Sequence, residues 1–211
     1  MSQNPNRPSV EQVYAAVNAV GISLGNYTYA VVGGAACTVL GSKRGTDDVD
    51  FVVPQGQTSC ARTRLRAQPI FRVMSGSLHT HYKSIPEVEI DILTPPALWA
   101  ETFDSSTPTI QIGSAKILKP TLILNAKCRS ILGRLSEIKR RNDANDIQFL
   151  LNWCATHGVR PTAPETPNIN NDFVQWFHDI FACPYQVWTN VGYDFQKGLF
   201  PSSLYQNPIA D

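Results

Sequence analysis

Two short segments of the chain alternate apolar residues with carboxylates, and proline follows close behind each of them. The first, DVDFVV at 48–53, carries Asp48 and Asp50 on one face, and the second, VEIDIL at 88–93, carries Glu89 and Asp91 on one face. Alternation with a period of two predicts β-strands whose other face is buried. A charged carboxylate inside an apolar strand costs free energy unless it has a partner. The two segments therefore predict strands of one sheet that share an acidic site.

A glycine pair precedes the first acidic strand. Residues 27–32 are β-branched and aromatic and lead into Gly33 and Gly34, after which small residues predict a helix beginning at Ala35. A turn without side chains lets backbone N–H groups approach a phosphate. We therefore interpret the pair as a nucleotide-binding turn. Further candidate contacts lie between the pair and the strand, at Lys43, Arg44 and Thr46.

The remaining pattern before residue 120 predicts a small α+β core. We expect an amphipathic helix over 10–20 that ends at Gly21, then a helix and a strand within 63–74, with the strand near 70–73. A hairpin over 109–118 that turns at Gly113 and Ser114 is expected to follow.

Helical periodicity begins at Pro120. Its apolar stripe is Leu124, Cys128, Ile131 and Leu135. The basic run Lys139 to Arg141 is interpreted as a solvated turn, and Asn142 or Asp143 as the cap of a second helix. A proline-rich stretch, a short aromatic helix and an irregular tail follow.

These elements predict an α+β protein, a mixed β-sheet core with flanking helices followed by a helical C-terminal extension. We divide it into a catalytic core at 1–119, a helical hairpin packed on the core at 120–158, and a proline- and aromatic-rich extension at 159–211.

The composition limits the classes of partner. The 211 residues carry 18 basic and 17 acidic side chains, so the net charge of +1 supplies no global field that attracts bulk nucleic acid. The five cysteines are widely spaced and lack the paired spacing of a zinc site. No apolar run reaches the length of a membrane span. We expect a cytoplasmic protein that does not enter a membrane.

Carboxylates two residues apart on a strand project from the same face, close enough to share a divalent ion. With a third carboxylate from a neighbouring strand, Asp48, Asp50 and Asp91 predict a metal site for phosphoryl-type transfer. Hard oxygen ligands suit Mg²⁺ or Mn²⁺. We expect Asp48 and Asp50 to bridge the ions, and Asp91 to lie beside the acceptor hydroxyl and accept its proton.

In this order the elements resemble the nucleotidyltransferase superfamily with the DNA polymerase beta-type fold. The resemblance rests on Gly33-Gly34, the thirteen residues that follow, Asp48-Val49-Asp50 and the later Asp91. The stretch RGTDDVDFVV is most similar to small members that modify small molecules, antibiotics or tRNA. The resemblance covers about residues 25–155 and implies transfer of an NMP from an NTP to a hydroxyl, with pyrophosphate release.

Two cations on the first helix after the core are expected to clamp the triphosphate. Lys127 and Arg134 are seven residues apart, or roughly 10 Å along one side of a helix at ~1.5 Å per residue. That distance is comparable to the length of a triphosphate.

Several alternatives stay open. Asp47 could take the place of Asp48 if the strand began one residue earlier, although its side chain would then face away from that of Asp50. A glycosyltransferase also uses an Asp-x-Asp metal site, and a catalytically idle relative would serve as a binding module. His79 and His81 match a two-histidine metal edge but are more simply the polar face of a strand. The acceptor is unnamed by the sequence, and the near-neutral charge favours a small molecule over tRNA or protein. The preferred NTP and any oligomer are likewise unassigned.

Overall fold

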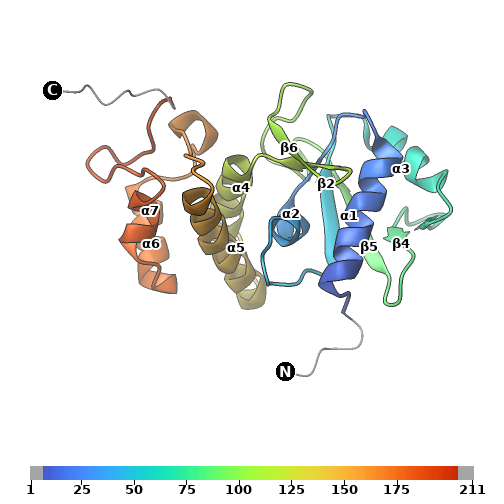
Figure 1. Ribbon diagram of the computed structural model, residues 1–211, viewed down its shortest axis with the longest axis horizontal. Helices are drawn as coiled ribbons and strands as arrows, with labels where there is room; N and C mark the ends of the chain where they lie inside the picture. The colour runs from blue at the N-terminus through green and yellow to red at the C-terminus, as the bar shows by residue number, and fades with distance from the viewer. Residues whose placement is uncertain (1–6, 204–211) are drawn as a thin grey trace. The chain divides into compact units, whose positions relative to one another are not determined.

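A mixed β-sheet carries the two acidic strands at its centre. The computed structural model describes residues 7–203, and Figure 1 shows its helices and strands. The sheet has seven strands in the order β3-β4-β5-β2-β1-β7-β6. Their bounds are β1 Ala30–Val31, β2 Asp48–Val52, β3 Phe71–Val73, β4 Thr80–Tyr82, β5 Val88–Leu93, β6 Thr109–Ile112 and β7 Ala115–Leu118.

The strand pairings bring the two acidic strands side by side. Strands β2 and β5 are parallel neighbours, with Asp48 opposite Glu89 and Asp50 opposite Asp91. Strand β1 pairs antiparallel with β2 and parallel with β7. The pairs β3–β4, β4–β5 and β6–β7 are antiparallel. The mixed α+β sheet expected from the sequence is confirmed.

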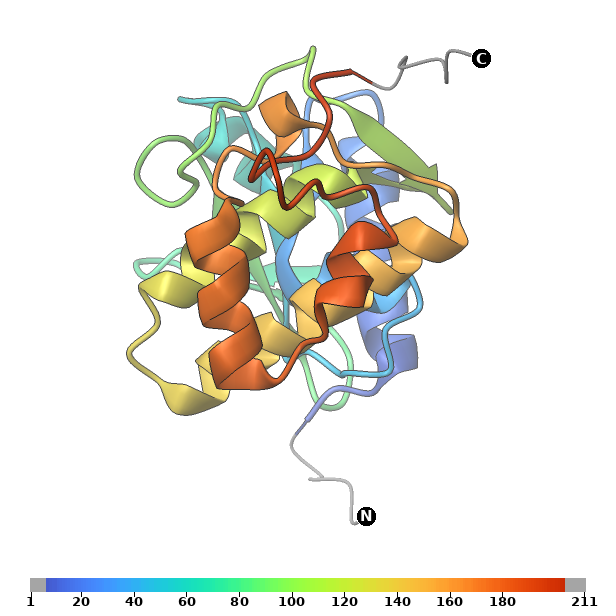
Figure 2. The same ribbon diagram turned by 90° about the vertical axis from the view of Figure 1, so that its left-hand side faces the viewer.

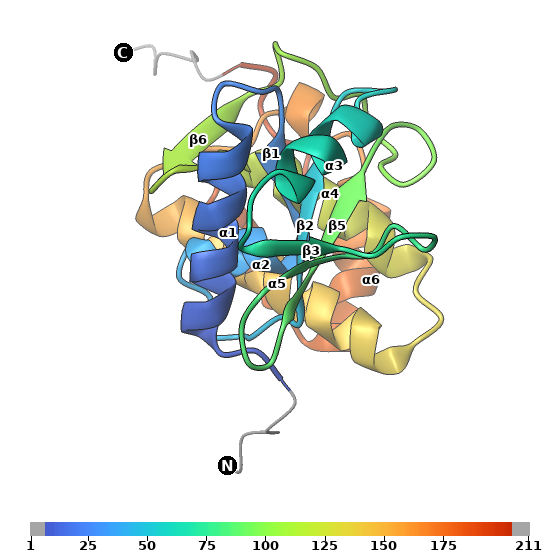
Figure 3. The same cartoon turned by 90° about the vertical axis from the view of Figure 1, so that its right-hand side faces the viewer.

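The chain divides into two compact units, one that ends at Lys119 and one that begins at Pro120. In the first unit, α1 (Val10–Leu24) and α3 (Thr58–Arg66) pack on the sheet, and Figure 3 shows both helices on the same face. The short helix α2 (Gly33–Val39) contacts β2. Val49, Phe51 and Ile90 are buried. The carboxylates alternate with these apolar side chains and so belong to the opposite face of the strands.

The first helix is longer than its sequence pattern predicts. We expected Gly21 to end it, but α1 continues to Leu24 and Gly25 follows at φ +54°. A Cβ atom on Gly21 would lie 2.3 Å from the carbonyl oxygen of Ser114. Gly21 therefore serves close packing against the β6–β7 turn, a long-range role that a local pattern cannot reveal.

Other local predictions also need correction. Only Ala30 and Val31 of the expected strand at 27–32 form β1, and α2 begins at Gly33 rather than at Ala35. Helix α3 begins at Thr58, upstream of the segment 63–74 in which we expected a helix and then a strand. Strand β4 was given no bounds in advance, although His79 and His81 were interpreted as the polar face of a strand.

The second unit is helical. Its elements are α4 (Pro120–Leu132), α5 (Glu137–Thr156), the 3₁₀ turn Ala163–Glu165, α6 (Asn171–Phe181) and α7 (Tyr185–Thr189). Helices α4 and α5 form a hairpin, which can be followed in Figure 2. Aromatic side chains of α6 and α7 pack on one another, with Trp188 completely buried.

The start of α5 differs from the prediction. The helix begins at Glu137 and is capped by Ser136, so the basic run from Lys139 lies within it rather than in a turn. Asp143, which we expected as a cap, is buried in the helix. Leu135 lies beyond the end of α4 and is fully exposed.

Among the described residues, none of the helices has the length and apolar character needed to cross a membrane.

Candidate active site

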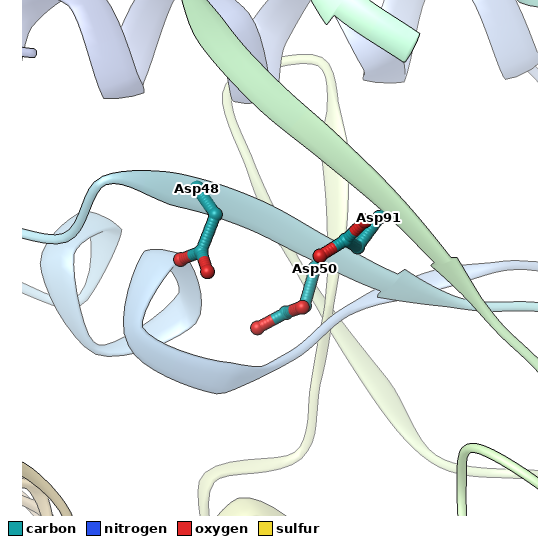
Figure 4. A group of neighbouring side chains, drawn as sticks. All are labelled: Asp48, Asp50 and Asp91. Carbon is teal, nitrogen blue, oxygen red and sulfur yellow. The ribbon is translucent and has the colours of Figure 1, made fainter. Parts of the chain in front are cut away.

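Three carboxylates converge where β2 and β5 run side by side. Asp48 and Asp50 extend from β2 and Asp91 extends from β5, as Figure 4 shows. Each of the three offers an oxygen atom, and these atoms all lie within 4.8 Å of one another. Such a separation lets one divalent cation contact several of them. The alternation read from the sequence thus brings together the three aspartates that it singled out.

Gly33 lies directly against this cluster. Its φ of +64° is in the region that glycine adopts without strain, and a Cβ atom there would lie 2.2 Å from Oδ2 of Asp50. Gly34 leaves room in the same way, because its Cβ would lie 2.7 Å from both Nη2 of Arg44 and Oγ1 of Thr46. The glycine pair is therefore required by the packing of the site itself.

The loop before β2 orients the first aspartate. Thr46 is buried, and its hydroxyl donates a hydrogen bond of 2.7 Å to Oδ1 of Asp48. Arg44 is half-buried, and its Nη1 donates to the carbonyl of Gly45. Lys43 is exposed, and its side chain has no ion pair among the described residues. Of the three predicted loop contacts, the structure brings Arg44 and Thr46 to Gly34.

Asp47 lies outside the cluster although it is adjacent in sequence. Its side chain is 69% exposed and forms an ion pair of 2.6 Å with Nε of Arg7. Arg7 also donates to the carbonyl of Gly45 and so fastens the loop from the other side. The sequence left open whether Asp47 could replace Asp48, and the structure assigns the inward position to Asp48.

Asp91 is set apart by its electrostatic surroundings. Burial raises the pKa of its carboxyl, and the neighbouring carboxylates of Glu89 and Asp48 raise it further, while His79 and His81 act in the opposite direction. Like charges crowded together favour protonation or the binding of a cation. A bound divalent ion would remove this repulsion, so the donor set fits a metal of the Mg²⁺ or Mn²⁺ type.

Glu89 is a site neighbour that the sequence interpretation left without a role. The strand alternation did place it on the face of Asp91, which was the available signal. Its Oε1 lies 3.0 Å from Nδ1 of His79, and His81 lies 3.9 Å from Glu87. Within residues 7–203, the aspartate cluster is the one group with three metal-type ligands, so the two histidines have carboxylate partners but no third ligand.

Lys127 lies in α4, but Arg134 lies beyond the end of that helix at Leu132, so the helical spacing expected between the two cations is not present. Both contact a carboxylate within the second unit. Nζ of Lys127 lies 2.8 Å from Oδ1 of Asp143 and 2.8 Å from Oδ2 of Asp146, and Nε of Arg134 lies 2.7 Å from Oδ2 of Asp143. Lys127 is only 9% exposed, so it is not an ordinary solvated cation. Sequence reasoning missed this network because its partners are distant in the chain.

The fold has counterparts among solved structures. An antigenic nucleotidyltransferase-like protein from Paracoccidioides brasiliensis superposes with a TM-score of 0.63 and 20% identity, over 93% of this chain and 98% of that chain. A structure described as a candidate nucleotidyltransferase from H. pylori gives a TM-score of 0.53 at 14% identity, over 90% of this chain and 82% of its own.

The chain has a nucleotidyltransferase fold. This confirms the fold that the sequence resemblance implied, including a helical part after the sheet. JHP933 from Helicobacter pylori matches similarly, with a TM-score of 0.53, 15% identity, and coverage of 90% of this chain and 79% of that one. No protein-family model matches the sequence, and no curated protein sequence matches it. The relationship is thus one of fold, and the activity has to be argued from the site.

Proposed function

We propose that the chain transfers an NMP group from an NTP to the hydroxyl of a small-molecule acceptor and releases pyrophosphate. The observation that carries the proposal is the convergence of Asp48, Asp50 and Asp91 against the glycine pair on a nucleotidyltransferase fold. Neither half is specific alone, since acidic strand ends and glycine turns are both common. Their direct contact through Gly33 and Asp50 is what a shared nucleotide site requires.

The three aspartates would hold the divalent metal. When bound, Mg²⁺ or Mn²⁺ neutralises phosphate charge and makes the acceptor hydroxyl easier to deprotonate. Asp48 and Asp50 supply oxygen ligands from one strand, and the Thr46 hydroxyl keeps Asp48 in a fixed orientation. The donor set contains only oxygen, which matches hard cations.

Asp91 is assigned to the acceptor side. Its pKa is raised by burial and by the adjacent carboxylates, so it has a stronger tendency to take a proton than an isolated aspartate. A carboxylate of that kind is suited to accept the hydroxyl proton as the oxygen attacks the α-phosphorus. The P–O bond to pyrophosphate breaks as the new P–O bond forms.

The nucleotide phosphates are assigned to the backbone of Gly33 and Gly34 and to the side chains of Lys43, Arg44 and Thr46. Gly33 and Gly34 are the first residues of α2, and without side chains there the backbone N–H groups can approach phosphate oxygens without steric hindrance. Lys127 and Arg134 stay predicted triphosphate ligands. Arg134 uses Nε on Asp143, and its guanidinium has further N–H donors for a phosphate.

The two alternatives have less support. A glycosyltransferase would share the Asp-x-Asp pattern, but that pattern gives no reason for the fit between Gly33 and Asp50. A catalytically idle module would not need all three metal-type carboxylates. It would bind NTP and Mg²⁺ without turnover, which separates it from the enzyme.

A turnover assay with two aspartate variants tests the proposal. Purified protein is incubated with Mg²⁺, each NTP labelled on the α-phosphate and a small-molecule extract, and both pyrophosphate release and labelled product are measured. We expect Asp50→Asn to abolish both, because it removes a metal ligand while keeping the shape of the side chain. Asp47→Asn is the matched control, since this carboxylate is adjacent in sequence but paired with Arg7.

Two results would contradict the enzyme. One is near-normal pyrophosphate release by Asp50→Asn at saturating Mg²⁺. The other is the absence of release by the wild-type protein with every NTP while calorimetry detects NTP binding, which identifies the idle module.

A further inference from the structure

A pocket in the second unit has no part in the proposed transfer. Its volume is about 570 Å³, and its lining residues are Asn171, Asp172, Gln175, Tyr185 and Phe195. They come from the first two turns of α6, from the start of α7 and from the segment that follows it. A cavity of this size accommodates a small organic molecule.

Two aromatic rings form a right-angled wall of the pocket. The rings of Tyr185 and Phe195 have centroids 5.4 Å apart and an interplanar angle of 87°. The Tyr185 ring is stacked on His178 at 4.2 Å, and Phe195 packs edge-on against Tyr193 at 5.0 Å. Each ring therefore has a second aromatic neighbour, His178 for Tyr185 and Tyr193 for Phe195. These contacts restrain the angle between the two rings without a ligand.

The polar side chains of the lining are hydrogen-bonded to one another and to their neighbours. The Tyr185 hydroxyl donates to Oε1 of Gln175 at 2.6 Å, and Nε2 of Gln175 donates to Oδ1 of Asp179 at 2.9 Å. Nδ2 of Asn171 donates to the carbonyl of Phe195 at 3.1 Å. The single O–H of Tyr185 is thus used within the protein, and each of the two amides has one of its two N–H bonds engaged, so the Tyr185 hydroxyl is left with oxygen lone pairs.

Asp172 adds a formal negative charge. It is exposed, lies in the first turn of α6, and makes no hydrogen bond or ion pair with any residue in the described range 7–203. Lys197, a cation further along the same segment, is paired with Asp194 instead. The pocket thus combines an unpaired carboxylate with two aromatic rings, and its lining contains no cation.

We propose that this pocket binds a small organic ammonium ion, with the cationic head in the corner of Tyr185 and Phe195 and Asp172 as its counter-ion. An ammonium group is attracted to the negative face of an aromatic ring. A fully methylated ammonium ion has no N–H to donate, so proteins bind it with aromatic rings rather than with hydrogen-bond acceptors. Anions are disfavoured by the carboxylate, and neutral apolar ligands gain nothing from it. The inference is separate from the proposed transfer and uses none of its residues.

Choline and dimethylbutanol, its uncharged carbon isostere, are the probes. Binding of each to the full chain is measured by calorimetry without nucleotide or metal, so that failure of the transfer activity has no bearing on the result. We expect choline to bind about tenfold or more tightly than the isostere. Asp172→Asn should remove most of that preference, and Phe195→Leu, which keeps an apolar side chain but loses the π face, should reduce it.

Glu137→Gln is the control, because this exposed glutamate of α5 pairs with Arg141 outside the pocket. It should bind both probes as the wild-type protein does. A merely structural role of Asp172 or Phe195 would change the affinities for both probes together and leave their ratio intact. Equal affinity for the two probes, no binding of choline, or an unchanged ratio in Asp172→Asn would overturn the proposal.

Discussion

The three aspartates of the candidate site differ in their surroundings, and the difference makes Asp91 the most informative to change. Asp48 accepts a hydrogen bond from Thr46, whereas the pKa of Asp91 is raised by burial and by Glu89 and Asp48. A carboxyl whose folded pKa is raised stabilises the fold at pH values below its unfolded pKa. That contribution is lost as the pH rises through the folded pKa. At neutral pH without metal, the charged Asp91 therefore destabilises the protein.

We therefore expect Asp91→Asn to melt at a higher temperature than the wild type at pH 7 in EDTA. Saturating Mg²⁺ should stabilise the wild type more than the variant, which has lost a ligand. The variant should lose turnover but keep much of its NTP affinity, since Asp48 and Asp50 remain. Thermal melts and NTP titrations check these points. An Asp91→Asn protein that loses NTP binding as completely as Asp50→Asn would remove Asp91 from the acceptor side.

Gly33 gives a second prediction at the same scale. Gly33→Ala would force a Cβ atom to within 2.2 Å of Oδ2 of Asp50 at a positive φ, so Asp50 must move. We expect a loss of stability of about 1 kcal/mol or more from the backbone and a near-complete loss of NMP transfer. Gly56→Ala is the control, because Gly56 also has a positive φ but open space at its Cβ.

Urea unfolding and the turnover assay separate the two effects. Gly56→Ala should lose stability and keep activity, since it has the strain without the collision. If Gly33→Ala retained wild-type turnover, the contact between the turn and Asp50 would have no functional meaning.

At the scale of single residues, the sequence predicted site residues correctly where the two-residue alternation of a strand decides which face a side chain lies on. Asp48, Asp50 and Asp91 were found because alternation assigns faces without knowledge of the fold. Asp47 and Asp48 were harder to distinguish, since one residue of strand register decides between them. The deciding contact, from Arg7 to Asp47, spans 40 residues and leaves no local pattern.

Among elements, the hairpin of α4 and α5 shows where local patterns mislead. Aspartate is a residue type favoured at helix N-caps, and a basic run precedes Asp143, so the sequence predicted a turn there. In the structure Asp143 is a buried partner of Lys127 and Arg134, and Ser136 caps the helix. Asp143 therefore forms ion pairs with residues before its own helix and does not cap that helix.

That network predicts unequal effects of two alanine variants. Lys127→Ala would leave Asp143 and Asp146 buried without their shared cation, which costs about 3 to 5 kcal/mol. Arg134→Ala should cost much less, because its side chain is 38% exposed and Asp143 keeps Lys127. Urea unfolding measures both. Equal losses of unfolding free energy would mean that the two cations stabilise Asp143 equally and that their different burial has no effect on stability.

The same network predicts the acid response of the fold. Burial alone would raise the pKa of Asp143, but Lys127 and Arg134 outweigh it and hold the pKa below its ordinary value. This carboxylate therefore stabilises the fold at pH values above its unfolded pKa, and the contribution is lost as the pH falls through the folded pKa. The difference in unfolding free energy between the wild type and Lys127→Ala should shrink on acidification.

For the whole molecule, strand identity was easier to predict than strand order. The sequence indicated strands near 48–53 and 88–93, yet their parallel pairing depends on the chain between them forming α3, β3 and β4. The two-residue β1 lies between β2 and β7, and although its residues were expected to form a strand, no local pattern identifies these two neighbours. Long-range strand pairing of this kind is determined by packing, and it cannot be predicted from the periodicity of a single segment.

The last prediction concerns the acceptor and rests on a property of the whole chain. A protein that binds tRNA neutralises several phosphates and releases their counterions. Its affinity falls steeply as the salt concentration rises, because counterion release then contributes less free energy. This chain has a net charge of +1 and supplies no such field. We expect label from α-labelled NTP to enter small-molecule product and not bulk tRNA.

The rate with the small-molecule acceptor should change by no more than about twofold between 50 and 200 mM salt, whereas several phosphate contacts would lower it by orders of magnitude. Incubation with total tRNA and, separately, with a small-molecule extract, each over that salt range, makes the measurement. Asp50→Asn controls for contaminating transferases. Label that precipitates with tRNA and declines steeply with salt would reverse the acceptor assignment while leaving the aspartate site and its nucleotide chemistry unchanged.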